Sequence, residues 1–191
     1  MSLRQLPNAI SIARMLLVIP IAWAVGAARL NEALILCAIA AFSDALDGYL
    51  AKRFDWTSEL GKLLDPLADK LLLVTLFITL SIVDSVPVWL AVAAVSRDVV
   101  IGVGALAYRH FFGPVEGRPT VISKINTGLQ LIYVLAVIGL QAHGNPPPAL
   151  MMARDVLGAA VFVTTLVSGI DYVSRYWRKA IVVTRERRQS A

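Results

Sequence analysis

Residues Ser43–Lys70 read SDALDGYLAKRFDWTSELGKLLDPLADK, and this stretch decides how the rest of the chain is organised. It carries four regularly spaced aspartates, which are Asp44, Asp47, Asp65 and Asp69. Strongly apolar runs flank it on both sides, at residues 33–42 and 71–83. Carboxylates beside sequence of membrane-spanning character are costly, and they usually have a partner and mark a functional site. We therefore expect the chemistry of this protein to lie in this stretch.

The overall composition is that of an integral membrane protein. The chain has 191 residues, of which 58% are hydrophobic and 16% are charged, and its mean hydropathy is +0.70. Soluble domains are about half apolar and about a quarter charged. The length fits one bundle, so we predict a single membrane domain over residues 1–191, with a basic tail at about 178–191. The single cysteine, Cys37, excludes a disulfide framework within the chain.

Apolar runs separated by charged and turn-forming residues predict an all-α protein with six transmembrane helices. After a short interfacial segment over residues 1–7, the spans are expected at about 8–28, 33–53, 61–83, 88–108, 122–141 and 149–176. Each reaches the roughly 20 residues that a helix needs to cross a bilayer. Arg14, near the start of the first span, is expected to extend toward the lipid headgroups.

Lysine and arginine are concentrated in alternate connections between the expected spans. The second, fourth and C-terminal connections hold Lys52, Arg53, Lys62, Arg109, Arg118, Lys124, Arg175, Arg178, Lys179, Arg185, Arg187 and Arg188. The others hold only Arg29 and Arg154. Because basic loops stay in the cytoplasm, both termini and the aspartates are predicted there, at the face of a bacterial inner membrane. The net charge of +5 fits an anionic lipid surface better than nucleic acid.

The spacing of the four aspartates indicates a site for divalent cations. Residues three or four apart share a helix face, and a short connection makes the two acidic helices antiparallel neighbours. Four carboxylates in a low-dielectric site repel one another, and divalent ions relieve that repulsion. Ligands that are all oxygen suit Mg²⁺ or Mn²⁺, and two ions can share four carboxylates. The alternative is that these are interface charges paired with Lys52, Arg53, Lys62 and Lys70.

At these residues the sequence resembles the CDP-alcohol phosphatidyltransferase family. The family pattern is D-x-x-D-G-x-x-A-R, eight residues, then G-x-x-x-D-x-x-x-D. It is matched here by Asp44, Asp47, Gly48, Ala51, Gly61, Asp65 and Asp69. Lys52 stands where the family has arginine, which keeps the charge but loses the planar fork. The small residues of the pattern also leave room for a ligand to approach the backbone.

The resemblance implies a reaction and a role for each matched residue. CDP-diacylglycerol binds with its diphosphate on two divalent ions, an acceptor hydroxyl attacks the phosphorus next to diacylglycerol, and CMP leaves. Asp44, Asp47 and Asp65 are implied as metal ligands, and Asp69 as both ligand and general base. The residues implied in substrate binding at this end are Asn8, Gly48, Ala51, Lys52, Ser58 and Gly61. A homodimer is also implied.

Two further stretches bear on the acceptor alcohol. Residues 96–99 and 119–127 resemble the cardiolipin synthase branch, whose acceptor is phosphatidylglycerol. The phosphatidylglycerophosphate synthase branch, which uses glycerol 3-phosphate, shares the Arg-acid pair and the Lys-x-x-Thr spacing and stays as an alternative. The basic residues expected to hold the acceptor phosphate are Arg97, Arg118 and Lys124. A divalent-cation transporter and a non-catalytic scaffold are the alternatives from other classes, and neither would release CMP.

Overall fold

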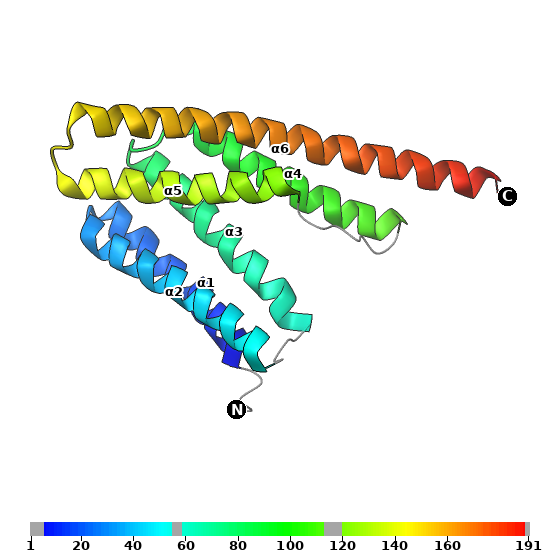
Figure 1. Ribbon diagram of the computed structural model, residues 1–191, viewed down its shortest axis with the longest axis horizontal. Coiled ribbons are helices and arrows are strands. Elements are labelled where there is room, and N and C mark those ends of the chain that lie inside the picture. The colour runs from blue at the N-terminus through cyan, green and yellow to red at the C-terminus, as the bar shows by residue number, and fades with distance from the viewer. Residues whose placement is uncertain (1–5, 55–58, 113–119, 190–191) are drawn as a thin grey trace. The chain divides into compact units, whose positions relative to one another are not determined.

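The computed structural model describes residues 6–54, 59–112 and 120–189, and within these ranges the chain forms six α-helices and no strand (Figure 1). The helices are α1 (Leu6–Gly26), α2 (Leu30–Phe54), α3 (Glu59–Ile82), α4 (Val88–Phe112), α5 (Val121–His143) and α6 (Pro148–Gln189). The all-α prediction is confirmed. Helix α6 continues well beyond the expected end of the sixth span, because residues 177–189 contain neither proline nor glycine to end a helix.

Helices of membrane-spanning length and composition occur in four places among the described residues. They are Asn8–Gly26, Val88–Ala107, Val121–His143 and Pro148–Arg175. Helices α2 and α3 are of similar length, but the charged residues of the central stretch occupy the end of α2 and the start of α3. Four apolar helices support an integral membrane protein, and the six-span layout stays a prediction.

The chain divides into two compact units. One comprises Met1–Val88 and Val134–Arg154, and the other comprises Trp89–Tyr133 and Asp155–Ala191. In the first unit, α1 packs against both α2 and α3. In the second, α4, the first part of α5 and most of α6 supply the packed residues, and the rings of Trp89 and Phe162 meet edge to face at 5.0 Å between centroids. The prediction of one domain over the whole chain is not tested by this division.

The buried face of α1 changes from polar to apolar along its length. Ser11 and Arg14 lie on it near the start, and Val18, Ile21 and Val25 continue it at intervals of three or four residues. The buried face of α2 runs the opposite way, from Ala33 and Cys37 to Asp47. The apolar ends of these faces form the core of the first unit, and their polar ends meet at the site described below.

Helix α1 ends in a turn that suits glycine but holds alanine. Ala28 has φ 57°, its N–H donates to the carbonyl of Val25, and the N–H of Arg29 reaches back to Ala24 at 2.8 Å. This is the Schellman arrangement, in which the left-handed residue is usually glycine.

Ala28→Gly is expected to stabilise the protein by about 0.5–1 kcal/mol, because a left-handed conformation strains any residue with a Cβ atom. Thermal unfolding in detergent would measure this gain. Ala27→Gly is the matched control, since Ala27 is not among the residues with positive φ. It should lower the melting temperature through added chain entropy alone. An equal fall in melting temperature in Ala28→Gly and Ala27→Gly would contradict the expectation.

Candidate active site

Three aspartates of the central stretch converge on one arginine of α1. The Nη1 atom of Arg14 donates to Asp44 and also to Asp69 Oδ1, at 2.7 Å in the second case, while Nη2 donates to Asp47. Asp44 and Asp47 come from α2 and Asp69 from α3. Three helices therefore contribute to one cluster of charges, which we call the aspartate cluster (Asp44, Asp47, Asp69 and Arg14).

The packing of the first unit explains why the cluster forms. The end of α2 and the start of α3 lie beside the start of α1, because α2 runs antiparallel to α1 and α3 runs back in the direction of α1. Asp44 and Asp47 are three residues apart and share a helix face. The prediction that the two acidic pairs face each other is supported for these two residues and Asp69. Asp65 lies one turn before Asp69 in α3, but its side chain is outside the described part of the structure.

The members of the cluster differ in burial. The side chains of Arg14 and Asp47 are 1% and 3% exposed, whereas those of Asp44 and Asp69 are 50% and 48% exposed. Ser11, one turn before Arg14, donates a long hydrogen bond of 3.4 Å to Asp47 Oδ2. Asp47 and Arg14 thus form the closed floor of the cluster, and Asp44 and Asp69 form its open side. The open side is where a ligand can reach the carboxylates.

Other residues predicted for this end of the site are described only in part. Asn8 lies in the first turns of α1, one turn before Ser11. Gly48, Ala51 and Lys52 lie in the last turns of α2 and Gly61 in the first turn of α3, with side-chain surroundings outside the described part of the structure. Ser58 and Arg118 lie outside the described residues altogether. The substrate-binding roles of these residues stay predictions.

Arg97, which is predicted to bind the phosphate of the acceptor alcohol, lies in the second unit and is 6% exposed. Its Nη1 atom donates to Asp98 at 2.6 Å, and Nη2 donates to Ser123 of α5 at 2.7 Å and to Ser168 of α6. Neighbours on a helix point in different directions, so sequence adjacency alone does not require the Arg97–Asp98 pair. Its Nε atom has no acceptor among the described residues. A buried arginine with one unused donor is a candidate site for an anionic group.

A polar seam joins α5 and α6 within the second unit. The side-chain oxygen of Asn126 accepts hydrogen bonds from Thr164 at 2.8 Å and Thr165 at 2.9 Å. Thr120 caps α5 by accepting from the N–H of Ser123 at 3.1 Å. Lys124 is exposed in the first turns of α5. The seam fixes the register of α5 against α6, and it thereby positions the two serines that hold Arg97.

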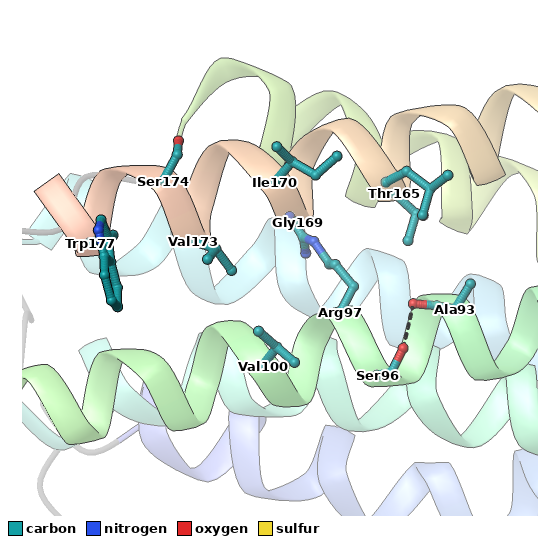
Figure 2. A pocket seen from close by; sticks show the side chains of 11 residues that line it. Ala93, Ser96, Arg97, Val100, Thr165, Gly169, Ile170, Val173, Ser174 and Trp177 are labelled. Carbon is teal, nitrogen blue, oxygen red and sulfur yellow. Dashed lines mark hydrogen bonds between the residues drawn. The ribbon is translucent and has the colours of Figure 1, made fainter.

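An apolar hollow of about 560 Å³ lies between α4 and α6, also within the second unit. Figure 2 shows Val173 and Trp177 of α6 on one side of it and Val100 of α4 on the other, with the side chain of Arg97 extending across toward Gly169. A Cβ atom built on Gly169 would lie 3.7 Å from Cγ of Arg97, so the aliphatic part of Arg97 runs past this glycine. The hollow therefore suits a hydrocarbon chain better than a polar ligand.

Comparison with known proteins identifies the family. The sequence profile of the CDP-alcohol phosphatidyltransferase family matches residues 4–170, which include the whole aspartate cluster. The chain belongs to the CDP-alcohol phosphatidyltransferase family. This confirms the resemblance seen in the aspartate pattern, and the shared chemistry of the family is phosphatidyl transfer.

Relatives within the family carry two different names. Proteins of Rattus norvegicus and Homo sapiens named cardiolipin synthase (CMP-forming) are 31% and 30% identical over 196 and 197 residues, covering 94% and 95% of this chain. The chain spans only 64% of the length of each. A Bacillus subtilis protein named CDP-diacylglycerol–glycerol-3-phosphate 3-phosphatidyltransferase is 33% identical over 191 residues, covering 91% of this chain and 95% of its own.

The aspartate cluster fits the divalent cations expected in a CDP-alcohol phosphatidyltransferase. Its donors are all carboxylate oxygens, which Mg²⁺ and Mn²⁺ prefer, and they already surround a cation, the guanidinium of Arg14. Among the described residues, no three acidic, histidine or cysteine side chains are arranged to hold an ion as they stand. A guanidinium holds carboxylate oxygens further apart than a metal ion does.

Arg14 is the residue of this site that sequence reasoning missed. The expectation that it extends toward the headgroups is wrong, since Arg14 is buried and paired with three carboxylates. A signal was present in the sequence. Asn8, Ser11 and Arg14 form a polar stripe at intervals of three residues in an otherwise apolar helix, and a charge inside such a helix almost always has a partner. The partners considered from sequence were Lys52, Arg53, Lys62 and Lys70, and Arg14 adds to them a partner that was not considered.

Proposed function

We propose that this protein is a cardiolipin synthase that transfers a phosphatidyl group from CDP-diacylglycerol to phosphatidylglycerol and releases CMP. The observation that carries the proposal is the convergence of Asp44 and Asp47 of α2 and Asp69 of α3 on the guanidinium of Arg14 in α1. Burying a cluster of charges in a membrane protein costs free energy, and charged groups retained at such positions usually mark a functional site. The proposal includes six transmembrane helices, a site at the cytoplasmic face of a bacterial inner membrane, and a homodimer.

The chemical roles follow from the exposure of each carboxylate. Asp69 is proposed to accept the proton of the acceptor hydroxyl, because it lies on the open side of the cluster and an alcohol is a poor nucleophile at neutral pH. Asp44, Asp47 and Asp65 are proposed to hold two Mg²⁺ or Mn²⁺ ions. Bound ions of this kind stabilise the charge that develops on the attacking and leaving oxygens. Asp47 is the most buried of the three described aspartates, and it is proposed to anchor the closed floor of the cluster through its bond to Arg14.

Substrate recognition at the nucleotide end is proposed from the family pattern. The residues concerned are Asn8, Gly48, Ala51, Lys52, Ser58 and Gly61. Arg97, Arg118 and Lys124 are proposed to hold the acceptor phosphate, with the unused Nε donor of Arg97 supporting its part. We propose that the apolar hollow beside Arg97 holds an acyl chain of the acceptor. Phosphatidylglycerol has such chains, and glycerol 3-phosphate has none.

Phosphatidylglycerophosphate synthesis is the second candidate, and one observation favours it. The Bacillus subtilis relative whose name specifies glycerol 3-phosphate is 33% identical over 191 residues, whereas the rat and human relatives named cardiolipin synthase are 31% and 30% identical. Both candidates use CDP-diacylglycerol and release CMP. They differ only in the alcohol that attacks.

Purified protein given CDP-diacylglycerol with each acceptor in turn distinguishes the two. With phosphatidylglycerol we expect cardiolipin and CMP, identified by mass spectrometry of the lipid product. Gly169→Leu, which directs a side chain into the hollow, should raise KM for phosphatidylglycerol several-fold. Use of glycerol 3-phosphate, which has no acyl chain to place in the hollow, should fall less, because both acceptors share any effect of the new side chain on Arg97. Phosphatidylglycerophosphate as the only product would overturn the cardiolipin proposal in favour of the second candidate.

A further inference from the structure

We infer that Arg14 is a built-in counter-ion that holds the carboxylates together and competes with divalent cations for them. Its guanidinium occupies the centre of the aspartate cluster, bonded to Asp44, Asp47 and Asp69. This inference rests on the proposed function, because it assumes that the same carboxylates bind divalent ions. It makes Arg14 a positioning residue whose action depends on whether metal is present.

The geometry of the cluster is close to that of a metal site but wider. Two oxygens bonded to one nitrogen at about 2.7–2.9 Å lie up to roughly 5.5 Å apart. Two oxygens bonded to one Mg²⁺ at about 2.1 Å lie at most roughly 4 Å apart. Asp44 and Asp69, which share Nη1 of Arg14, therefore need to approach each other by only an ångström or two. Arg14 keeps carboxylates from two helices within that reach.

The charges explain why arginine and metal compete. The three described carboxylates and Arg14 sum to a net charge of −2, and Asp65 would make it −3. Two divalent ions would neutralise all four carboxylates without Arg14, so its guanidinium would then be an excess positive charge beside other cations. Arg14 also fits its surroundings imperfectly, because its buried Nε atom has no acceptor among the described residues. A cation held in this way stabilises the cluster but remains replaceable.

The experiment compares detergent-solubilised wild type with Arg14→Gln under two conditions, with chelator and with saturating Mn²⁺. The quantities measured are the melting temperature and the affinity for Mn²⁺. We expect Arg14→Gln to lower the melting temperature in chelator, where three carboxylates lose the arginine that they share, and Mn²⁺ to restore most of the loss. We also expect the variant to bind Mn²⁺ more tightly than wild type, by roughly tenfold, because a positive charge about 5 Å from the ion is removed. Electron paramagnetic resonance of free Mn²⁺ measures that affinity directly.

Two controls make the result specific. Arg29→Gln removes an exposed arginine that pairs with Glu32 at 3.4 Å, and it should shift the melting temperature little and equally in both conditions. Arg14→Lys keeps the charge but loses the planar fork, so it should fold in chelator and bind Mn²⁺ about as wild type does. If Arg14→Gln does not fold without metal, purification in Mn²⁺ still allows its affinity to be compared with that of Arg14→Lys.

A purely structural arginine would give a different pattern. Arg14→Gln would then lose equal stability with and without Mn²⁺, and its Mn²⁺ affinity would be unchanged or weaker. Either result overturns the inference. Neither readout depends on CMP release, so failure of the counter-ion role is separable from failure of the proposed reaction. If neither wild type nor Arg14→Gln binds Mn²⁺, the metal part of the proposed function fails as well.

Discussion

Asp69→Asn is expected to reduce CMP release from CDP-diacylglycerol by about a thousandfold, because it removes the proposed general base and one proposed metal ligand together. The protein should stay folded in the membrane. The Asp69 side chain is half exposed, and its loss leaves Arg14 paired with Asp44 and Asp47. Release of labelled CMP and thermal unfolding of the same preparation measure the two effects separately.

Asp84→Asn is the matched control for this substitution. Asp84 is an exposed residue of the same unit with φ 55°, and asparagine tolerates the left-handed conformation well. It should keep wild-type activity and stability. An Asp69→Asn variant that retained half of the wild-type rate would remove Asp69 as the base and leave the acceptor hydroxyl without one.

Removal of divalent cations is expected to abolish turnover, and addition of Mg²⁺ or Mn²⁺ should restore it. The physical reason is the charge of the proposed complex. A diphosphate brings further negative charge to a cluster that already carries three described carboxylates and only one arginine. Without cations the negative site repels its negative substrate. The resulting loss of substrate affinity ranges from several-fold to many thousand-fold, depending on the effective dielectric constant of the site. CMP release followed before chelation, after it and after metal is returned checks this expectation.

Much of the fold is predictable because membrane-spanning sequence is strongly constrained. Apolar runs set the approximate limits of the helices, and residues such as Pro87 and Gly144 fall in the connections between them. The end of helix α6 was harder to predict, because the charged residues beyond the sixth span are compatible with both a helix and an extended tail. Helices α2 and α3 were predicted as spans from their apolar halves, and their polar halves prevent composition from identifying them as such.

The aspartate cluster was predictable in part, because helical spacing specifies which residues share a face. The identity of their partner was not, because sequence spacing says nothing about which face of α1 meets α2. The contacts of Arg97 with Ser123 and Ser168 likewise could not be predicted from sequence spacing. They depend on how three helices of the second unit pack, and the hollow beside Arg97 depends on that packing too.

The role of the aspartates in holding divalent ions is tested most directly by measuring CMP release against the concentration of free Mn²⁺ in wild type and in Asp44→Asn. We predict no release in chelator, saturable activation of wild type, and at least a tenfold higher Mn²⁺ requirement in the variant, since one carboxylate on the open side of the cluster is lost. Release that persists in chelator, or the same Mn²⁺ dependence in both proteins, would contradict the claim that these aspartates hold the ions.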